Sequence, residues 1–108
     1  MFILISKFFT PKGFNGITIF PFVILRNVKS KMNLRLINHE KIHIRQQLEL
    51  LVLPFFIWYL VEYLFRLYQF KDRNKAYRNI VFEREAYENE KDLNYLQKRS
   101  FWNFLRYY

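Results

Sequence analysis

The pattern of apolar and polar positions divides the chain into a strand region followed by helices. Residues 16–25 are rich in β-branched and aromatic side chains, which is typical of one strand or a short hairpin. Pro21 favours an edge position there, because proline has no backbone N–H to donate. From Asn33, a predicted N-cap, the pattern becomes helical and continues toward Leu53, where Pro54 should end or kink the helix.

Two more helices complete the predicted fold. Residues 55–70 form a helix that is apolar nearly all round, and such a helix is normally buried or in contact with a membrane. After a polar, basic connection over residues 71–78, a third helix is predicted over 81–98, and the aromatic tail 100–108 should form a short helix docked on the core. The pattern therefore predicts a mainly helical α+β fold, with a short edge strand or hairpin before three main helices.

Length and composition narrow the class of protein. A chain of 108 residues with 52% hydrophobic residues fits a single domain, 1–108, with a modest core. The aromatic share of 21% and the net charge of +9 suggest a surface that meets lipid headgroups, nucleic acid or another acidic partner. The chain has no cysteine, so disulfides, thiolate zinc sites and cysteine catalysis are excluded, and any metal must be held by histidine and carboxylate ligands.

Two apolar segments bear on location. The segment 1–9 lacks a basic start and is interrupted by Lys7, so we expect no cleavable signal peptide. The segment 50–60 is too short to cross a bilayer, which takes about 20 residues. It is either part of a buried helical hairpin or a shallow, membrane-contacting segment. We expect a cytoplasmic protein or one at the inner face of a membrane.

The two histidines of the chain are four residues apart, in the sequence His39-Glu40-Lys41-Ile42-His43. In a helix, positions i and i+4 share a face, so both imidazoles can bind one Zn²⁺ ion. Glu40 lies on the neighbouring flank, where its carboxylate can take a proton from a metal-bound water. The alternative is a helix whose two histidines only pack or face water.

A catalytic zinc site usually has a third protein ligand, and the chain offers no further histidine. The ligand must therefore be a carboxylate, and the acid-rich segment 82–90 is far enough along the chain to return to the histidines. Glu83 and Glu85 are the best candidates, because Phe82 or Ala86 can turn that face inward. The alternative for both is a solvated, charged helix end.

The His39–His43 motif, followed about forty residues later by Glu83-Arg84-Glu85-Ala86-Tyr87, resembles the gluzincin class of zinc metallopeptidases. It is also similar to small, uncharacterised bacterial proteins of metallopeptidase type. The resemblance covers the two motifs only. It implies a zinc ion held by His39, His43 and Glu83, with Ala86 at a position that is small in the family. The sequence departs from the family at Tyr87, where an aspartate normally orients a ligand histidine; a tyrosine hydroxyl is a weaker orienting group.

The resemblance implies a zinc-dependent, metallopeptidase-like hydrolase of peptide or protein substrates, in which Glu40 is the general base that activates a zinc-bound water. It also implies that an edge strand, here residues 17–25, receives the substrate backbone by strand addition. Tyr77 and Tyr87 are candidates for stabilising the oxyanion, with core packing as their alternative role.

Two alternative functions remain. The chain is either a catalytically weak or inactive zinc-binding relative that acts at an anionic membrane surface or through protein contacts, or, less favoured, a basic nucleic-acid-binding module. The basic stretches 26–45 and 71–78 suit phosphate backbones, but no base-reading motif accompanies them. The oligomeric state cannot be predicted from these patterns.

Overall fold

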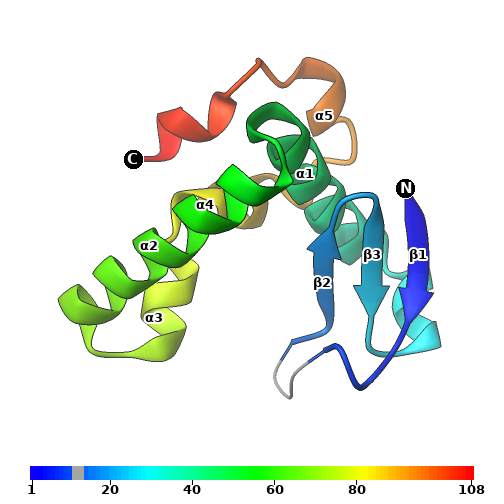
Figure 1. Cartoon of the computed structure of the whole chain (residues 1–108). Coiled ribbons are helices and arrows are strands. Elements are labelled where there is room, and N and C mark those ends of the chain that lie inside the picture. The colour runs from blue at the N-terminus through cyan, green and yellow to red at the C-terminus, as the bar shows by residue number, and fades with distance from the viewer. Residues whose placement is uncertain (11–13) are drawn as a thin grey trace.

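The N-terminal quarter of the chain forms a small sheet in the computed structural model, which describes residues 1–10 and 14–108. Strands β1 (Phe2–Ile5), β2 (Gly16–Ile19) and β3 (Phe22–Leu25) are arranged in the order β1-β3-β2, with β1 parallel and β2 antiparallel to β3 (Figure 1). The predicted hairpin is confirmed as β2–β3. Of its two strands only β2 lies at an edge, because β1 covers the other side of β3.

Two details of the strand prediction are wrong. Pro21 lies in the turn between β2 and β3 and not within an edge strand, because its fixed φ suits a turn and its carbonyl remains free to accept from Phe2 N. The N-terminal residues, for which no strand was predicted, form β1. A four-residue strand paired with a distant segment leaves little local signal in the sequence.

A short 3₁₀ helix, η1 (Val28–Met32), leads into α1 (Leu34–Leu50). The predicted N-cap is confirmed, since the Asn33 side chain accepts from Leu36 N at 3.1 Å. Helix α1 ends at Leu50, three residues before its predicted end, and the next residue, Leu51, has a positive φ of 66° that interrupts the helix. Pro54 does not break a helix; it lies in the first turn of α2 (Val52–Phe70), where a backbone N–H has no helical partner to lose.

The predicted connection over residues 71–78 contains a helix, α3 (Arg73–Arg78), which begins because the Asp72 side chain accepts from Lys75 N. The predicted third helix over 81–98 is two helices, α4 (Val81–Asn89) and α5 (Tyr95–Lys98). The break has a tertiary cause: Nδ2 of Asn38 on α1 donates to the carbonyls of Glu90 and Asp92, beyond the end of α4.

The tail docks on the core as predicted, through a 3₁₀ helix, η2 (Asn103–Tyr107), whose Phe104 is fully buried. Phe104 joins the main apolar cluster together with Phe55 of α2 and residues 80–82 at the start of α4. Helix α1 packs against β2, α2 and α4, and α3 folds back beside α2 (Figure 1). The mainly helical α+β class is therefore confirmed, and α1 lies between the edge strand and the helical part.

Helices α1 and α2 meet at an angle of 110°. Over the part of the chain that the structure describes, no single helix combines the length and the apolar character needed to cross a bilayer, and only the bent pair α1 and α2 together meets that criterion.

Candidate metal centre

Three buried side chains bring one ligand atom each to a common point. His39 Nε2 and His43 Nε2 are 3.2 Å apart, and Glu83 Oε1 lies 3.2 Å from the first and 3.1 Å from the second. The three residues are only 4–6% exposed. Zinc bonds of about 2.0–2.1 Å at tetrahedral angles place ligand atoms about 3.3 Å apart. The observed triangle therefore matches one face of a zinc coordination tetrahedron.

The local structure explains why these three atoms meet. Helix α1 presents the two histidines one turn apart, with their rings edge to face at 4.9 Å. Glu83 lies in the first turn of α4, between the fully buried Phe82 and a helix face that also buries Ala86. The predicted inward turn of this segment by Phe82 and Ala86 agrees with that burial.

The second candidate ligand, Glu85, points elsewhere. Its carboxylate is fully buried against Arg99, with Nε at 2.6 Å, and also accepts from Tyr95 and Gln46. Burial by itself would raise the pKa of Glu85, but hydrogen bonds from Arg99 and the other two donors lower it. Glu85 is therefore part of a structural ion pair, and Glu83 is the carboxylate that approaches the histidines.

The neighbours of the histidines decide which ring nitrogen carries a proton. His39 Nδ1 lies 3.1 Å from the carboxylate of Glu90, which can only accept, so Nδ1 is the donor. His43 Nδ1 lies 2.8 Å from Gln46 Oε1, and Gln46 Nε2 already donates to Phe82 O and to Glu85. The amide is thereby oriented with its oxygen toward His43, which must donate as well.

With Nδ1 as the donor, each histidine in its neutral form would present the lone pair of Nε2, and both Nε2 atoms face the same point as Glu83 Oε1. Three buried acceptors without a donor would repel one another, so the arrangement is favourable only with a proton or a metal cation between them. Glu83 is held in place by Tyr59, whose hydroxyl donates to Oε2 at 2.7 Å. The donor set, two neutral imidazoles and a carboxylate, is one that zinc prefers.

In the metal-free protein, a proton takes the place of that cation. Burial alone would lower the pKa of His43, but the charge and hydrogen bond of Glu83, assisted by Glu40, raise the pKa to about 9. Burial would in turn raise the pKa of Glu83, but His43 and His39 hold this pKa far below its ordinary value. Because burial and the charge of Glu83 raise the pKa of Tyr59, its hydroxyl remains a donor.

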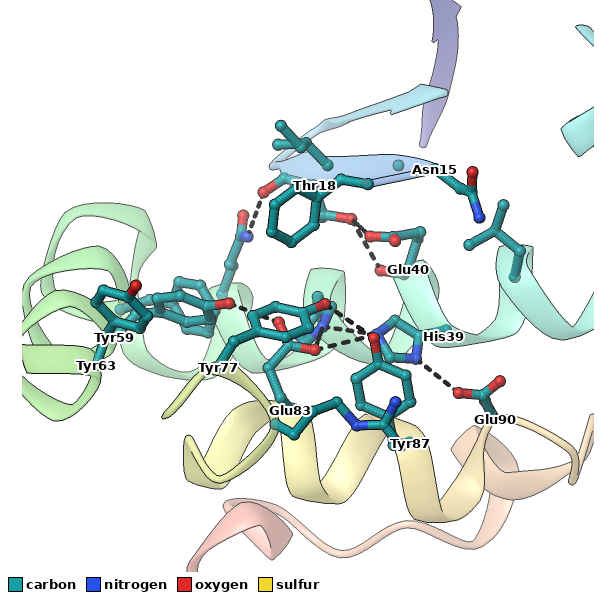
Figure 2. Close-up of a pocket in the computed structure, with 18 of the residues that line it drawn as sticks. Asn15, Thr18, His39, Glu40, Tyr59, Tyr63, Tyr77, Glu83, Tyr87 and Glu90 are labelled. Atoms are coloured by element: carbon teal, nitrogen blue, oxygen red, sulfur yellow. Dashed lines mark hydrogen bonds and ion pairs between the residues drawn. The ribbon is translucent and has the colours of Figure 1, made fainter. Parts of the chain in front are cut away.

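Glu40 lies beside the three ligands and turns toward the sheet (Figure 2). Its Oε2 accepts a hydrogen bond from the Thr18 hydroxyl on β2. Gly16 makes room for the other oxygen, since a Cβ at that position would lie 3.1 Å from Glu40 Oε1. The edge strand therefore positions the predicted general base.

Tyr87 does not orient His39, which is the role that the resemblance to gluzincins gives to an aspartate at this position. Its hydroxyl is 3.0 Å from that of Tyr77, while its ring packs edge to face on His39 at 4.5 Å. The carboxylate that orients His39 belongs to Glu90, seven residues after Glu83 (Figure 2). Positions i and i+7 share a helix face, so the spacing was a usable signal that the sequence analysis missed.

Three other functional candidates were also missed: Thr18, Gln46 and Tyr59. Their roles depend on contacts between distant segments, for which the sequence carries no spacing signal. Tyr77 and Tyr87, the two oxyanion candidates with core packing as the alternative, both line the pocket that contains His39 and Glu83. Burial, followed by the charge of Glu83, raises the pKa of Tyr77.

The ligand group opens into a pocket of about 1190 Å³. The pocket is lined by β2, by the histidine face of α1, by α2 and α3, and by Glu83, Tyr87 and Glu90. Comparison of the chain with protein-family models, with curated proteins and with solved structures finds no match. The function must therefore be argued from the geometry of this pocket.

Proposed function

We propose that this chain is a zinc-dependent, metallopeptidase-like hydrolase. The observation that carries the proposal is the triangle of buried acceptor atoms from His39, His43 and Glu83, with sides of 3.1–3.2 Å. Hydrogen bonds to Glu90 and Gln46 already occupy the other nitrogen of each histidine. Two histidines and a glutamate, with each histidine oriented by a hydrogen bond at its other nitrogen, are typical of zinc sites in enzymes.

A bound zinc ion would supply Lewis acidity, which makes a peptide carbonyl more electrophilic and a water molecule more acidic. The carboxylate of Glu40 would accept a proton from the attacking water and deliver it to the nitrogen that leaves when the C–N bond breaks. The Thr18 hydroxyl would hold that carboxylate in place. Tyr77 and Tyr87, whose hydroxyls reach the same pocket, would donate to the oxyanion.

The edge strand supports a peptide as the substrate. Residues 15–18 of β2 and the turn before it line the pocket beside Glu40, and β2 pairs with β3 on one side only within the described residues. An extended peptide could add to this side of β2 through backbone hydrogen bonds before Thr18, whose carbonyl already accepts from Gln47 Nε2. Its carbonyl groups would then pass the histidine pair.

The test combines metal content with peptide cleavage. We would measure zinc by mass spectrometry in protein purified without chelator or affinity tag, for wild type, His43→Ala, Glu40→Gln and Glu88→Gln. Glu88 is an exposed residue of α4, so Glu88→Gln is a matched control for the loss of a carboxylate. Wild type, Glu40→Gln and Glu88→Gln should each bind about one zinc per chain. His43→Ala should not.

Cleavage of a mixed peptide library should fall about 10²–10⁴-fold in Glu40→Gln and stay unchanged in Glu88→Gln. Equal zinc content in wild type and His43→Ala would refute the metal site. Zinc binding without Glu40-dependent cleavage would refute the enzyme and leave a zinc-binding relative that acts through contacts.

A further inference from the structure

Helix α2 carries an apolar face that no other part of the described chain covers. We call it the outer face of α2. Its members are 55–82% exposed. At about 100° per residue they occupy a sector of roughly 140° along the whole helix, and none of them is charged. The residues are Leu53, Ile57, Leu60, Val61, Leu64, Phe65 and Tyr68.

The outer face is too large to be an ordinary patch of surface. With about 200 Å² for a fully exposed large side chain, these exposures correspond to roughly 900 Å². The largest apolar patch on a typical soluble monomer is about 300–600 Å². The opposite side of α2 buries Phe55 and Glu62, so the helix is firmly attached to the protein while its outer face remains free to contact a partner.

The exposed surface of the described chain is strongly basic, in line with the net charge of +9. Most acids are buried, in the candidate metal centre or in ion pairs, and among the described residues only Asp72 and Glu88 are exposed. The structure exposes twelve lysines and arginines in the same described part of the chain. They are Lys7, Lys29, Lys31, Arg35, Lys41, Lys71, Arg73, Lys75, Arg78, Lys91, Lys98 and Arg106.

Part of this charge lies directly at one end of the outer face. Lys71 follows α2, and Arg73 and Lys75 lie on α3, which folds back beside α2 (Figure 1). Asp72 is the single acid between them and is used as the helix cap. A charge-free apolar face that ends in a group of exposed cations matches the boundary of a bilayer, where acyl chains lie below anionic headgroups.

We propose that the outer face of α2 docks on an anionic membrane surface, with α2 lying flat at headgroup level. Two copies of the chain would bring two strongly positive surfaces together, which opposes a dimer through this face. Nucleic acid fits poorly, because a charge-free face offers nothing to a phosphate backbone. Tyr68 suits the interface, where tyrosine is enriched.

The proposal goes beyond the proposed hydrolase and does not depend on it. The two are neighbours in space, because Leu60 belongs both to the outer face and to the lining of the pocket. A docked molecule would therefore hold its pocket beside the bilayer surface, within reach of the exposed segments of membrane-bound polypeptides.

Flotation with lipid vesicles tests this docking. The full chain, in buffer with chelator, would be mixed with vesicles of phosphatidylcholine containing 30% phosphatidylglycerol and with vesicles of phosphatidylcholine alone. Wild type should float with the anionic vesicles, bind neutral ones more weakly, and be released as salt is raised. Because chelator is present throughout, the result is independent of zinc.

Two pairs of substitutions separate the apolar and ionic parts. Ile57→Asp with Leu64→Asp should weaken binding at least about tenfold, since charges enter the buried contact. Lys71→Gln with Lys75→Gln should weaken binding to anionic vesicles about fivefold per charge and leave binding to neutral ones unchanged. Met32→Asp is the matched control, because Met32 is 84% exposed but lies in η1, and it should bind like wild type.

Three results would overturn the proposal. The first is that wild-type protein floats with neither anionic nor neutral vesicles. The second is equal weakening by Met32→Asp and by the α2 pair. The third is a concentration-dependent dimer in analytical ultracentrifugation that Ile57→Asp with Leu64→Asp abolishes while vesicle binding is absent, which would assign the face to a second copy of the chain.

Discussion

Replacing Glu90 by glutamine should weaken zinc binding about tenfold. The carboxylate of Glu90 is buried, accepts from His39 Nδ1 at 3.1 Å and also pairs with Arg35. Glutamine keeps the shape and one acceptor oxygen but removes the charge. A hydrogen bond to a charged group contributes about 1.5–3 kcal/mol, and a neutral one about 0.5–1.5 kcal/mol. The difference of about 1–1.5 kcal/mol corresponds to roughly a factor of ten in affinity.

The affinity would be measured by competition with a chromophoric chelator at fixed pH. Glu88→Gln, an exposed substitution on the same helix, should leave the dissociation constant unchanged. Tyr87→Phe removes a hydroxyl that, among the described residues, bonds only to Tyr77. It should change the constant less than about twofold, because hydrogen bonds between neutral groups contribute little net energy. A larger loss in Tyr87→Phe than in Glu90→Gln would refute the assignment of Glu90 as the orienting group.

Three more predictions follow from the same pocket. Gly16→Ala should lower peptide cleavage at unchanged zinc content, because the new Cβ would crowd Glu40 Oε1 at 3.1 Å; unchanged cleavage would contradict the role of Gly16. In chelator, the stability that His43 contributes should be complete below its ordinary pKa of 6.5 and lost as pH rises through about 9, and the stability that Glu83 contributes should be present above 4.5 and lost at lower pH. The melting temperature, measured against pH, should therefore fall both at alkaline and at acidic pH. Saturating zinc should remove the alkaline fall. Tyr59→Phe should destabilise the metal-free protein by about 1.5–3 kcal/mol in urea unfolding, since Glu83 Oε2 loses a buried donor, and an effect below about 0.5 kcal/mol would show that water replaces the hydroxyl.

The parts of the site that the sequence predicted are those set by local geometry. One helical turn brings His39 and His43 together whatever the rest of the fold does, and the apolar neighbours of the acid-rich segment limited the carboxylate candidates to Glu83 and Glu85. The choice between Glu83 and Glu85 could not be made from the sequence. Arg99, fourteen residues later, holds the Glu85 carboxylate in an ion pair away from the histidines, and no local sequence pattern predicts that pair.

The fold shows the same division between local and distant causes. Asn33 starts a helix through a contact three residues away and was predicted, while the end of α4 depends on Asn38 from another helix and was not. Strand β1 escaped prediction for a similar reason, because four residues gain their strand structure only from pairing with β3. Exposure of the apolar α2 face could not be decided either, since core and membrane-facing helices have the same composition.

Leu51, whose φ is positive, joins α1 to α2 and thereby sets which side chains of α2 face the protein. A single residue inserted directly after Leu51 would rotate every later side chain of α2 by about 100° about the helix axis. Each residue would then take the place of the next one. Tyr59 would move to the exposed position of Leu60 and leave the carboxylate that it holds, and Val61 would displace Glu62 from its buried position. Insertions should therefore be far less tolerated after Leu51 than in the turn between α4 and α5. Insertion scanning should show a larger loss of folded protein at the first position than at the second.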